Sequence, residues 1–257
     1  MIELKNITWR REDRDILNGV DLTVKAGERW VLLGRNGCGK STLLEMITGY
    51  MFPTSGTVDV LGHRFGRVDV REVRKKIGNI GPSLIEKLIG RDPVWEIIVG
   101  GMNAYLRIYE EIPEEVKARA REELDRVGLG SRFEQPFGTL SQGERKKALL
   151  ARTMMADPEL LIMDEPCAGL DLYEREKFLD SLETLSKRVQ GMLYVTHHIE
   201  EIVPLFTHVA LMAEGRIIAA GPKREVLTAE LLRDAYEVPV QVRWVEDRPW
   251  ITVEKEG

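Results

Sequence analysis

A glycine-rich stretch near the N-terminus constrains the fold more than any other part of this sequence. Residues 34–41 read GRNGCGKS and match the pattern G-x-x-x-x-G-K-[ST], between an apolar stretch predicted as a strand and a helix predicted over about residues 40–48. Glycine lets the backbone bend so that successive amides point at one anion, and a helix N-terminus adds partial positive charge. We therefore predict a phosphate-binding loop made by Gly34, Arg35, Asn36, Gly37, Cys38, Gly39, Lys40, Ser41 and Thr42.

The loop predicts a nucleoside triphosphate and a metal ion as ligands. Lys40 is placed to reach the β and γ phosphates, and the Ser41 hydroxyl to bind Mg²⁺. Residues 160–166 (LLIMDEP) read as a buried strand that delivers two acids to the sheet edge where ligands bind. We expect Asp164 to complete the Mg²⁺ site and Glu165 to orient and deprotonate the attacking water. Taken alone, this segment also fits a strand followed by an ordinary acidic turn.

Strand-like and helix-like stretches alternate along the chain, which predicts an α/β fold with a P-loop core, a mostly parallel sheet and an N-terminal antiparallel β part. The period becomes helical between about residues 93 and 156, with Asp92 as the N-cap, Pro93 at the first helical position and a second helix over about 113–127. We expect one domain over residues 1–234, with a core of 1–83 and 158–234 and an inserted helical subdomain of about 84–157. Residues 235–257 read as a β-like extension without an assigned role.

Composition narrows the class of protein. The charged fraction of 31% is spread without long polar tracts, which argues against disorder. The net charge of −5 argues against nucleic acid as a partner. There is no apolar run of the roughly 18 residues needed to cross a bilayer. The two cysteines, Cys38 and Cys167, cannot build a disulfide framework, so we expect a cytoplasmic protein; a thiol-sensitive active site is a minor alternative.

Residues 140–144 read LSQGE, and with the two motifs above they give the chain its resemblance to the ATP-binding cassette (ABC) family over about residues 2–230. Read locally, Ser141 is an N-cap and Glu144 completes a capping box. The resemblance implies that Ser141, Gln142, Gly143 and Glu144 present a helix N-terminus to the γ-phosphate of ATP bound on a second copy of the chain. Hydrolysis would then require a homodimer with ATP and Mg²⁺ between its subunits.

Three further positions resemble family features. The stretch AGLD ends in Asp171, which the resemblance places in a loop that links the two nucleotide sites. His197 follows an apolar strand and resembles the switch histidine that contacts the γ-phosphate and water, whereas His198 reads as the start of the next helix. Trp9 occupies the place of an adenine-stacking aromatic, although a strand aromatic packed in the core is the alternative.

One position departs from the family. A glutamine that contacts Mg²⁺ and relays to a membrane subunit normally ends the strand before the helical insert, but residues 77–83 (IGNIGPS) offer only Pro82 or Ser83 there. The resemblance favours the ATPase subunit of an ABC transporter, which hydrolyses ATP to ADP and phosphate and drives a separate membrane permease from the inner face of the cell membrane. The alternative is a stand-alone soluble ABC ATPase acting on a macromolecular or cofactor-assembly partner, which the missing glutamine favours.

Overall fold

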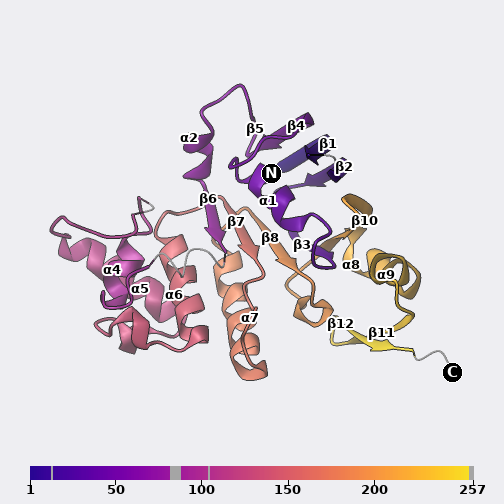
Figure 1. Ribbon diagram of the computed structural model, residues 1–257. Coiled ribbons are helices and arrows are strands. Elements are labelled where there is room, and N and C mark those ends of the chain that lie inside the picture. Colours follow the sequence, from indigo (N-terminus) through magenta and orange to yellow (C-terminus); the bar gives the residue numbers. More distant parts are fainter. Residues whose placement is uncertain (13, 82–87, 104, 255–257) are drawn as a thin grey trace. The chain divides into compact units, whose positions relative to one another are not determined.

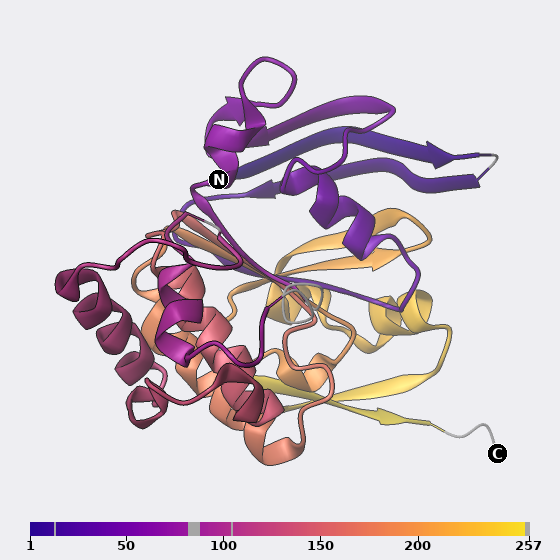
Figure 2. The same ribbon diagram turned by 60° about the vertical axis from the view of Figure 1, so that its left-hand side comes forward.

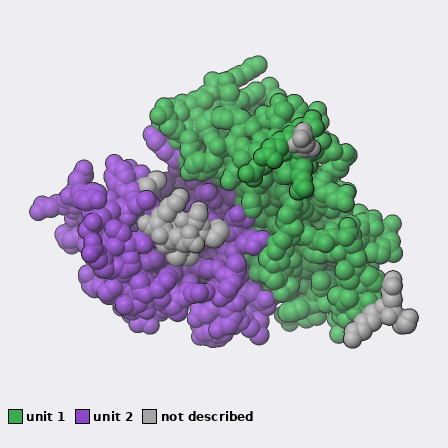
Figure 3. Space-filling view, viewed as in Figure 1, with its two compact units in different colours: residues 1–74, 190–257 green, residues 75–189 purple. Residues whose placement is uncertain are grey.

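The computed structural model describes residues 1–12, 14–81, 88–103 and 105–254. The chain divides into two compact units (Figure 3): unit 1 comprises Met1–Arg74 and Gln190–Gly257, and unit 2 comprises Lys75–Val189. The phosphate-binding loop and His197 belong to unit 1, whereas Asp164, Glu165 and Ser141 belong to unit 2. Within the described residues, the helices are too short or too polar to span a membrane.

Unit 1 contains an antiparallel sheet in the order β2-β1-β4-β5, which confirms the predicted N-terminal β part. The strands are β1 (Ile2–Arg11), β2 (Arg14–Val24), β4 (Ser55–Val60) and β5 (His63–Arg64), and the three long ones run alongside one another in Figure 2. Strand β1 turns the side chains of Ile2, Leu4 and Ile7 into the core, where each is at most 1% exposed. Large aliphatic side chains on one face therefore hold this sheet on the rest of unit 1.

A second set of strands in unit 1 surrounds β3 (Arg29–Gly34), which pairs in parallel with both β8 (Gly191–Thr196) and β9 (His208–Ala213). Strand β10 (Arg216–Pro222) pairs antiparallel to β9. Strands β3 and β8 are almost continuously buried, as expected for parallel strands covered on both faces. The helices of unit 1 are α1 (Lys40–Ile47), α2 (Val70–Arg74), α8 (Lys223–Val226) and α9 (Ala229–Tyr236), with the 3₁₀ turn η3 (Ile199–Glu201) (Figure 1).

Unit 2 contains the parallel pair β6 (Ile77–Ile80) and β7 (Leu160–Asp164). Helix α6 (Gln142–Met154) packs against β6 and three other helices. These are α4 (Val94–Val99), α5 (Glu114–Arg126) and α7 (Leu172–Ser186), and the 3₁₀ turns η1 (Gly130–Arg132) and η2 (Phe137–Thr139) lie between α5 and α6 in sequence. Together the units confirm the predicted α/β class, a mostly parallel arrangement and a helix-rich insert.

The start of α4 differs from the prediction. Pro93, expected as the first helical residue, is the N-cap with an extended backbone (φ −65°, ψ 151°), and Asp92 lies outside the helix. The cause is a tertiary contact, because Pro93 forms a β-bridge with Pro136 and the Phe137 amide donates to the Asp92 carbonyl at 2.9 Å. Helix α5 ends as expected, with Gly128 in the left-handed region at φ +73° just beyond it.

The C-terminal residues form a hairpin of β11 (Val240–Val245) and β12 (Arg248–Val253), where the sequence suggested one or two strands. Its two-residue turn, Glu246 and Asp247, has positive φ at both positions (47° and 62°). Such a turn matches the right-handed twist of the flanking strands, which explains why the pairing starts directly at Val245 and Arg248.

Candidate functional site

The phosphate-binding loop connects β3 to α1 in the setting that the motif requires. Gly37 and Gly39 adopt positive φ angles of 80° and 107°, which only glycine reaches without strain. Gly39 is the N-cap of α1 and, in the described residues, no side chain caps this helix start, nor does its first turn hold an acidic residue. The first amides of α1 are thus left for an anion.

Close packing beneath the loop leaves no room for side chains at two of its glycines. A Cβ on Gly34 would lie 2.3 Å from the Met212 carbonyl oxygen of β9. A Cβ on Gly39 would lie 2.9 Å from both Leu17 Cδ2 and Met212 Cε. A backbone hydrogen bond from the Gly215 amide to the Cys38 carbonyl (3.1 Å) ties the loop to the β9–β10 turn. The phosphate-binding loop, whose amides form a cradle for an anion, therefore packs against the strand pair β9–β10.

Lys40 is 5% exposed, and its ammonium group lies inside the loop. It donates to the Gly34 carbonyl at 2.7 Å and to the Arg35 carbonyl at 3.0 Å. Among the described residues, the acceptors of this buried ammonium are these two carbonyls, which do not neutralise its charge and so favour an anion next to it. The Ser41 side chain is exposed at the first turn of α1, where a hydroxyl can reach a ligand held by the loop.

The Cys38 thiol is half-buried, and burial raises its pKa, although the nearby Lys40 opposes this. A raised pKa keeps the sulfur protonated and poorly nucleophilic. For Cys38, this argues against the thiol-sensitive active site that the sequence left as a minor alternative.

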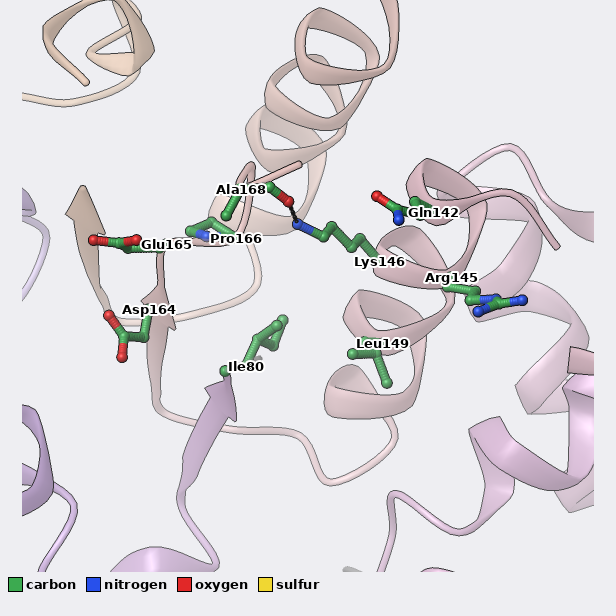
Figure 4. A pocket seen from close by; sticks show the side chains of 10 residues that line it. Ile80, Gln142, Arg145, Lys146, Leu149, Asp164, Glu165, Pro166 and Ala168 are labelled. Carbon is green, nitrogen blue, oxygen red and sulfur yellow. Dashed lines mark hydrogen bonds between the residues drawn. The ribbon is translucent and has the colours of Figure 1, made fainter. Parts of the chain in front are cut away.

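In unit 2, Asp164 ends β7 and Glu165 follows it, both half-exposed, as the strand prediction required. Glu165 has a φ of 45°, a left-handed conformation that is uncommon for a residue with a Cβ. The two acids line a pocket of about 240 Å³, together with Ile80, Gly81, Gln142, Arg145, Lys146, Leu149, Pro166 and Ala168 (Figure 4). The pocket thus opens beside the carboxylates, at the end of β6 and β7.

Lys146 is a pocket residue that the sequence analysis missed. Its ammonium donates to the Ala168 carbonyl, so α6 holds the loop that follows Glu165 (Figure 4). Gln142, Lys146 and Leu149 follow one another at spacings of four and three residues, which puts them on one face of α6. That spacing is visible in the sequence and is the signal that would have pointed to this face.

Ser141 is the N-cap of α6, and the predicted capping box is present. The Glu144 amide donates to Ser141 Oγ at 3.1 Å, and the Ser141 amide donates to Glu144 Oε2 at 2.9 Å. Partial burial raises the pKa of Glu144, but the Ser141 amide and the Arg132 guanidinium outweigh it, so the pKa of Glu144 is lowered. The Ser141 hydroxyl also interacts with the Glu144 carboxylate and adds to the lowering of its pKa, so the box ties the two side chains to each other as well as to the backbone.

The start of α6 packs closely on the start of α7. Gly143 is buried, and a Cβ there would lie 1.9 Å from Glu174 Oε2. Asp171 is the N-cap of α7, because its carboxylate accepts from the Glu174 amide at 2.9 Å. This local role was not foreseen and is compatible with the predicted link between two nucleotide sites, which stays a prediction.

His197 lies in unit 1 directly after β8, half-exposed, with its ring 4.0 Å from that of His198 (centroid to centroid). The Tyr236 hydroxyl donates to the His197 carbonyl at 3.3 Å. His198 is the N-cap of η3, in agreement with its expected position before the next helical turn.

Trp9 is half-exposed on β1 opposite Leu17, so part of its ring is accessible. The Pro82 and Ser83 positions lie outside the described residues.

Mg²⁺ commonly keeps several waters and takes one or two protein oxygens plus phosphate oxygens. The Ser41 hydroxyl of unit 1 and the Asp164 carboxylate of unit 2 are each an oxygen donor of the kind that Mg²⁺ takes. Among the described residues, no cluster of three or more His, Cys, Asp or Glu could hold a metal by itself.

Comparisons with known proteins agree with these features. The family model described as ABC transporter matches residues 17–168. The ABC transporter ATP-binding protein YlmA of Bacillus subtilis is 40% identical over 255 residues, which cover 98% of this chain and 97% of that protein.

Two solved structures share the fold. CbiO1 of Clostridium perfringens, described as part of the ABC transporter complex CbiONQ, has a TM-score of 0.78 and 26% identity, covering 91% of this chain and 92% of its own. The dimeric ATP-binding cassette MJ0796 bound to ADP and phosphate has a TM-score of 0.73 and 26% identity, covering 86% and 98%. With the phosphate cradle, the acidic strand end and the capped α6 in place, this chain belongs to the ABC transporter family, as one of its ATP-binding proteins.

Proposed function

We propose that this protein hydrolyses ATP to ADP and phosphate and thereby powers a separate membrane permease. The observation that carries the proposal is the phosphate-binding loop at the start of α1. Its backbone bends at glycines, its helix start has no side-chain cap among the described residues, and the buried Lys40 ammonium lies inside it. A cradle of amides and one ammonium binds a polyphosphate with many short hydrogen bonds. The relatives described above are transporter proteins, which favours this function over the stand-alone ATPase.

In the proposed mechanism, the loop from Gly34 to Thr42 binds the phosphates, and Trp9 stacks on the adenine. Ser41 and Asp164 would hold Mg²⁺, which supplies charge neutralisation on the phosphate oxygens when bound. Glu165 accepts the proton of the attacking water, and His197 contacts the γ-phosphate and that water. The phosphate-binding loop follows β3, Asp164 ends β7, and His197 follows β8.

A second copy of the chain completes the proposed site. The exposed Ser141 and the buried Gly143 lie at the well-formed N-terminus of α6, a structure that attracts phosphate. We expect this end of α6 to face the nucleotide of the partner subunit, with Gln142 and Glu144 beside it and Asp171 linking the two sites. The solved cassette MJ0796 is a dimer, which supports a two-fold arrangement for this chain.

The location and the domain limits are part of the same proposal. The protein would lie peripherally on the inner face of the cell membrane, bound to a permease made by another chain. Its core would comprise residues 1–83 and 158–234, with the helical subdomain at about 84–157. Co-purification of a multi-span protein from native membranes in mild detergent would support this, and its repeated absence would favour the stand-alone alternative.

Replacement of Glu165 by glutamine tests the catalytic step. We expect Glu165→Gln to bind ATP normally but to hydrolyse it about 10² to 10⁴ times more slowly, the usual effect of losing a general base. The matched control is Glu159→Gln, on the segment before β7, which should keep wild-type turnover. Steady-state phosphate release measures both, and near-normal turnover of the Glu165 variant would remove this residue from the mechanism.

A further inference from the structure

The C-terminal segment, residues 229–253, has no role in the proposed function. It comprises α9 and the β11–β12 hairpin, and it belongs to unit 1 (Figure 1). Helix α9 packs against β9 and β10, and β12 packs against η3, the turn that follows His197 and His198. The segment is therefore in contact with a loop to which we assign a part in hydrolysis.

The turn of the hairpin is anchored to α8. Lys223, which is 6% exposed, forms an ion pair with Asp247 (Nζ to Oδ2, 2.6 Å) and donates to the Asp247 carbonyl at 2.9 Å. Arg224 contacts the same carboxylate at 2.8 Å, and its guanidinium lies 4.5 Å from the centre of the Trp244 ring. An ammonium this deeply buried depends on its partner, so the turn is held in one place.

From this anchored turn, the segment reaches the His197 loop, residues 197–202. Arg248 Nε donates to the Glu200 carbonyl at 2.7 Å, and the Tyr236 hydroxyl donates to the His197 carbonyl. On its other side the loop is fixed by Glu201, which is 2% exposed and accepts from the Tyr194 hydroxyl at 2.8 Å and the Thr196 hydroxyl at 2.6 Å. Two independent sets of hydrogen bonds thus hold the peptide units that follow His197.

The same end of α9 also contacts the phosphate-binding loop. Glu237, in a left-handed conformation just after α9, pairs with Arg35 at 2.7 Å. Burial raises the pKa of Tyr236 far above its usual value, and the nearby Cys38 and Glu200 add to this. The Tyr236 hydroxyl therefore stays protonated and can act as a donor at any ordinary pH. Tyr236 and Glu237 together connect the two loops.

We propose that the C-terminal segment holds the His197 loop in register with the phosphate-binding loop, with Tyr236 and Arg248 as positioning residues for hydrolysis. The inference rests on the proposed function, because it assumes that His197 contacts the γ-phosphate. Tyr236 and Arg248 act through backbone carbonyls and do not need to touch the nucleotide. A histidine that must meet both a phosphate oxygen and a water depends on its backbone position, since small displacements from a productive geometry strongly slow a reaction.

The first test compares Tyr236→Phe and Arg248→Ala in the full-length chain. Each variant removes a hydrogen bond to the loop, and Arg248→Ala also removes the contact of the guanidinium with the Trp250 ring. Because neither variant changes a residue of the phosphate-binding loop, we expect kcat to fall about fivefold to tenfold with the KM for ATP unchanged. The matched controls are Tyr109→Phe and Arg243→Ala, which alter an exposed tyrosine and an exposed arginine and should keep the wild-type kcat.

The second readout is independent of hydrolysis. Amide hydrogen exchange of residues 198–202 should become faster in Tyr236→Phe, while exchange of β1 and β3 stays as in the wild type. Both results are needed: an unchanged kcat, an unchanged exchange rate in the His197 loop, or faster exchange throughout unit 1 would each overturn the inference. The proposed function fails differently, in that the wild-type protein would hydrolyse no ATP or Glu165→Gln would hydrolyse it at the wild-type rate.

Discussion

Replacing Gly34 by alanine is the sharpest test of the idea that β9 shapes the phosphate cradle. The new Cβ would lie 2.3 Å from the Met212 carbonyl oxygen and 2.8 Å from Cys38 Sγ, whereas real contacts of this kind are at least 3.0 Å. Gly34 and Met212 are also paired in the sheet register, so neither backbone can move alone. The first residue of the loop must therefore shift by several tenths of an ångström, away from β9.

We expect this shift to cost about 1 to 3 kcal/mol of the free energy of unfolding, the range for overpacking in a core. ATP binding should weaken by about tenfold or more, because the amides of the cradle no longer converge on the phosphates. Urea unfolding and calorimetric titration with ATP measure the two effects.

Gly62→Ala is the matched control for Gly34→Ala. Gly62 lies in the β4–β5 turn with a φ of +76°, and a Cβ there meets nothing within 4 Å. This variant should lose about 1 kcal/mol from backbone strain alone and should bind ATP as the wild type does. If Gly34→Ala also bound ATP with wild-type affinity, the cradle could not depend on the close approach to Met212, and the reasoning would be wrong.

Three other predictions follow from single contacts. Ser141→Arg should abolish hydrolysis but spare ATP binding by the monomer; unchanged phosphate release would refute a shared site. Arg152→Leu should lower the unfolding free energy by about 2 to 5 kcal/mol, since the buried guanidinium donates to the Ile97 and Tyr105 carbonyls. Lys223 lowers the pKa of Asp247 in the folded protein. The ionised carboxylate therefore stabilises the fold above about pH 4, and this stabilisation is lost as the pH falls below that value. The difference in unfolding free energy between wild type and Asp247→Asn should shrink as the pH falls, and a difference that stays constant would contradict this.

Local patterns predicted the parts of the site whose geometry is itself local. The phosphate-binding loop is one example, because the positive φ angles of Gly37 and Gly39 are a property of glycine at those positions. The capping box at Ser141 and Glu144 is another, because both hydrogen bonds span only three residues. In both examples, the residues that determine the geometry lie within a few positions of one another in the sequence.

Features that depend on distant residues escaped prediction. The start of α4 moved by one residue because Pro136, far along the chain, forms a bridge with Pro93. Lys146 was missed because its partner is a backbone carbonyl, at Ala168, which no side-chain pattern reveals. The contacts on which we base the proposed role of residues 229–253 escaped prediction for the same reason, since Tyr236 and Arg248 both donate to backbone carbonyls.

The strained backbone at Glu165 also depends on residues that are distant in the sequence, and it concerns a proposed catalytic residue. Its φ of 45° costs on the order of 1 to 3 kcal/mol for a residue with a Cβ, and the fold maintains it between a buried strand and the loop that Lys146 holds through Ala168. A glycine at position 165 would relieve this strain, but it would also remove the carboxylate that we propose as the proton acceptor. The fold thus retains an unfavourable backbone conformation at a proposed catalytic carboxylate, and the hydrogen bond from Lys146 to the Ala168 carbonyl holds the loop that follows it. Similarly, hydrogen bonds from Tyr236 and Arg248, which lie in other elements, hold the His197 loop. The backbone positions of both proposed catalytic residues therefore depend on contacts with other parts of the fold.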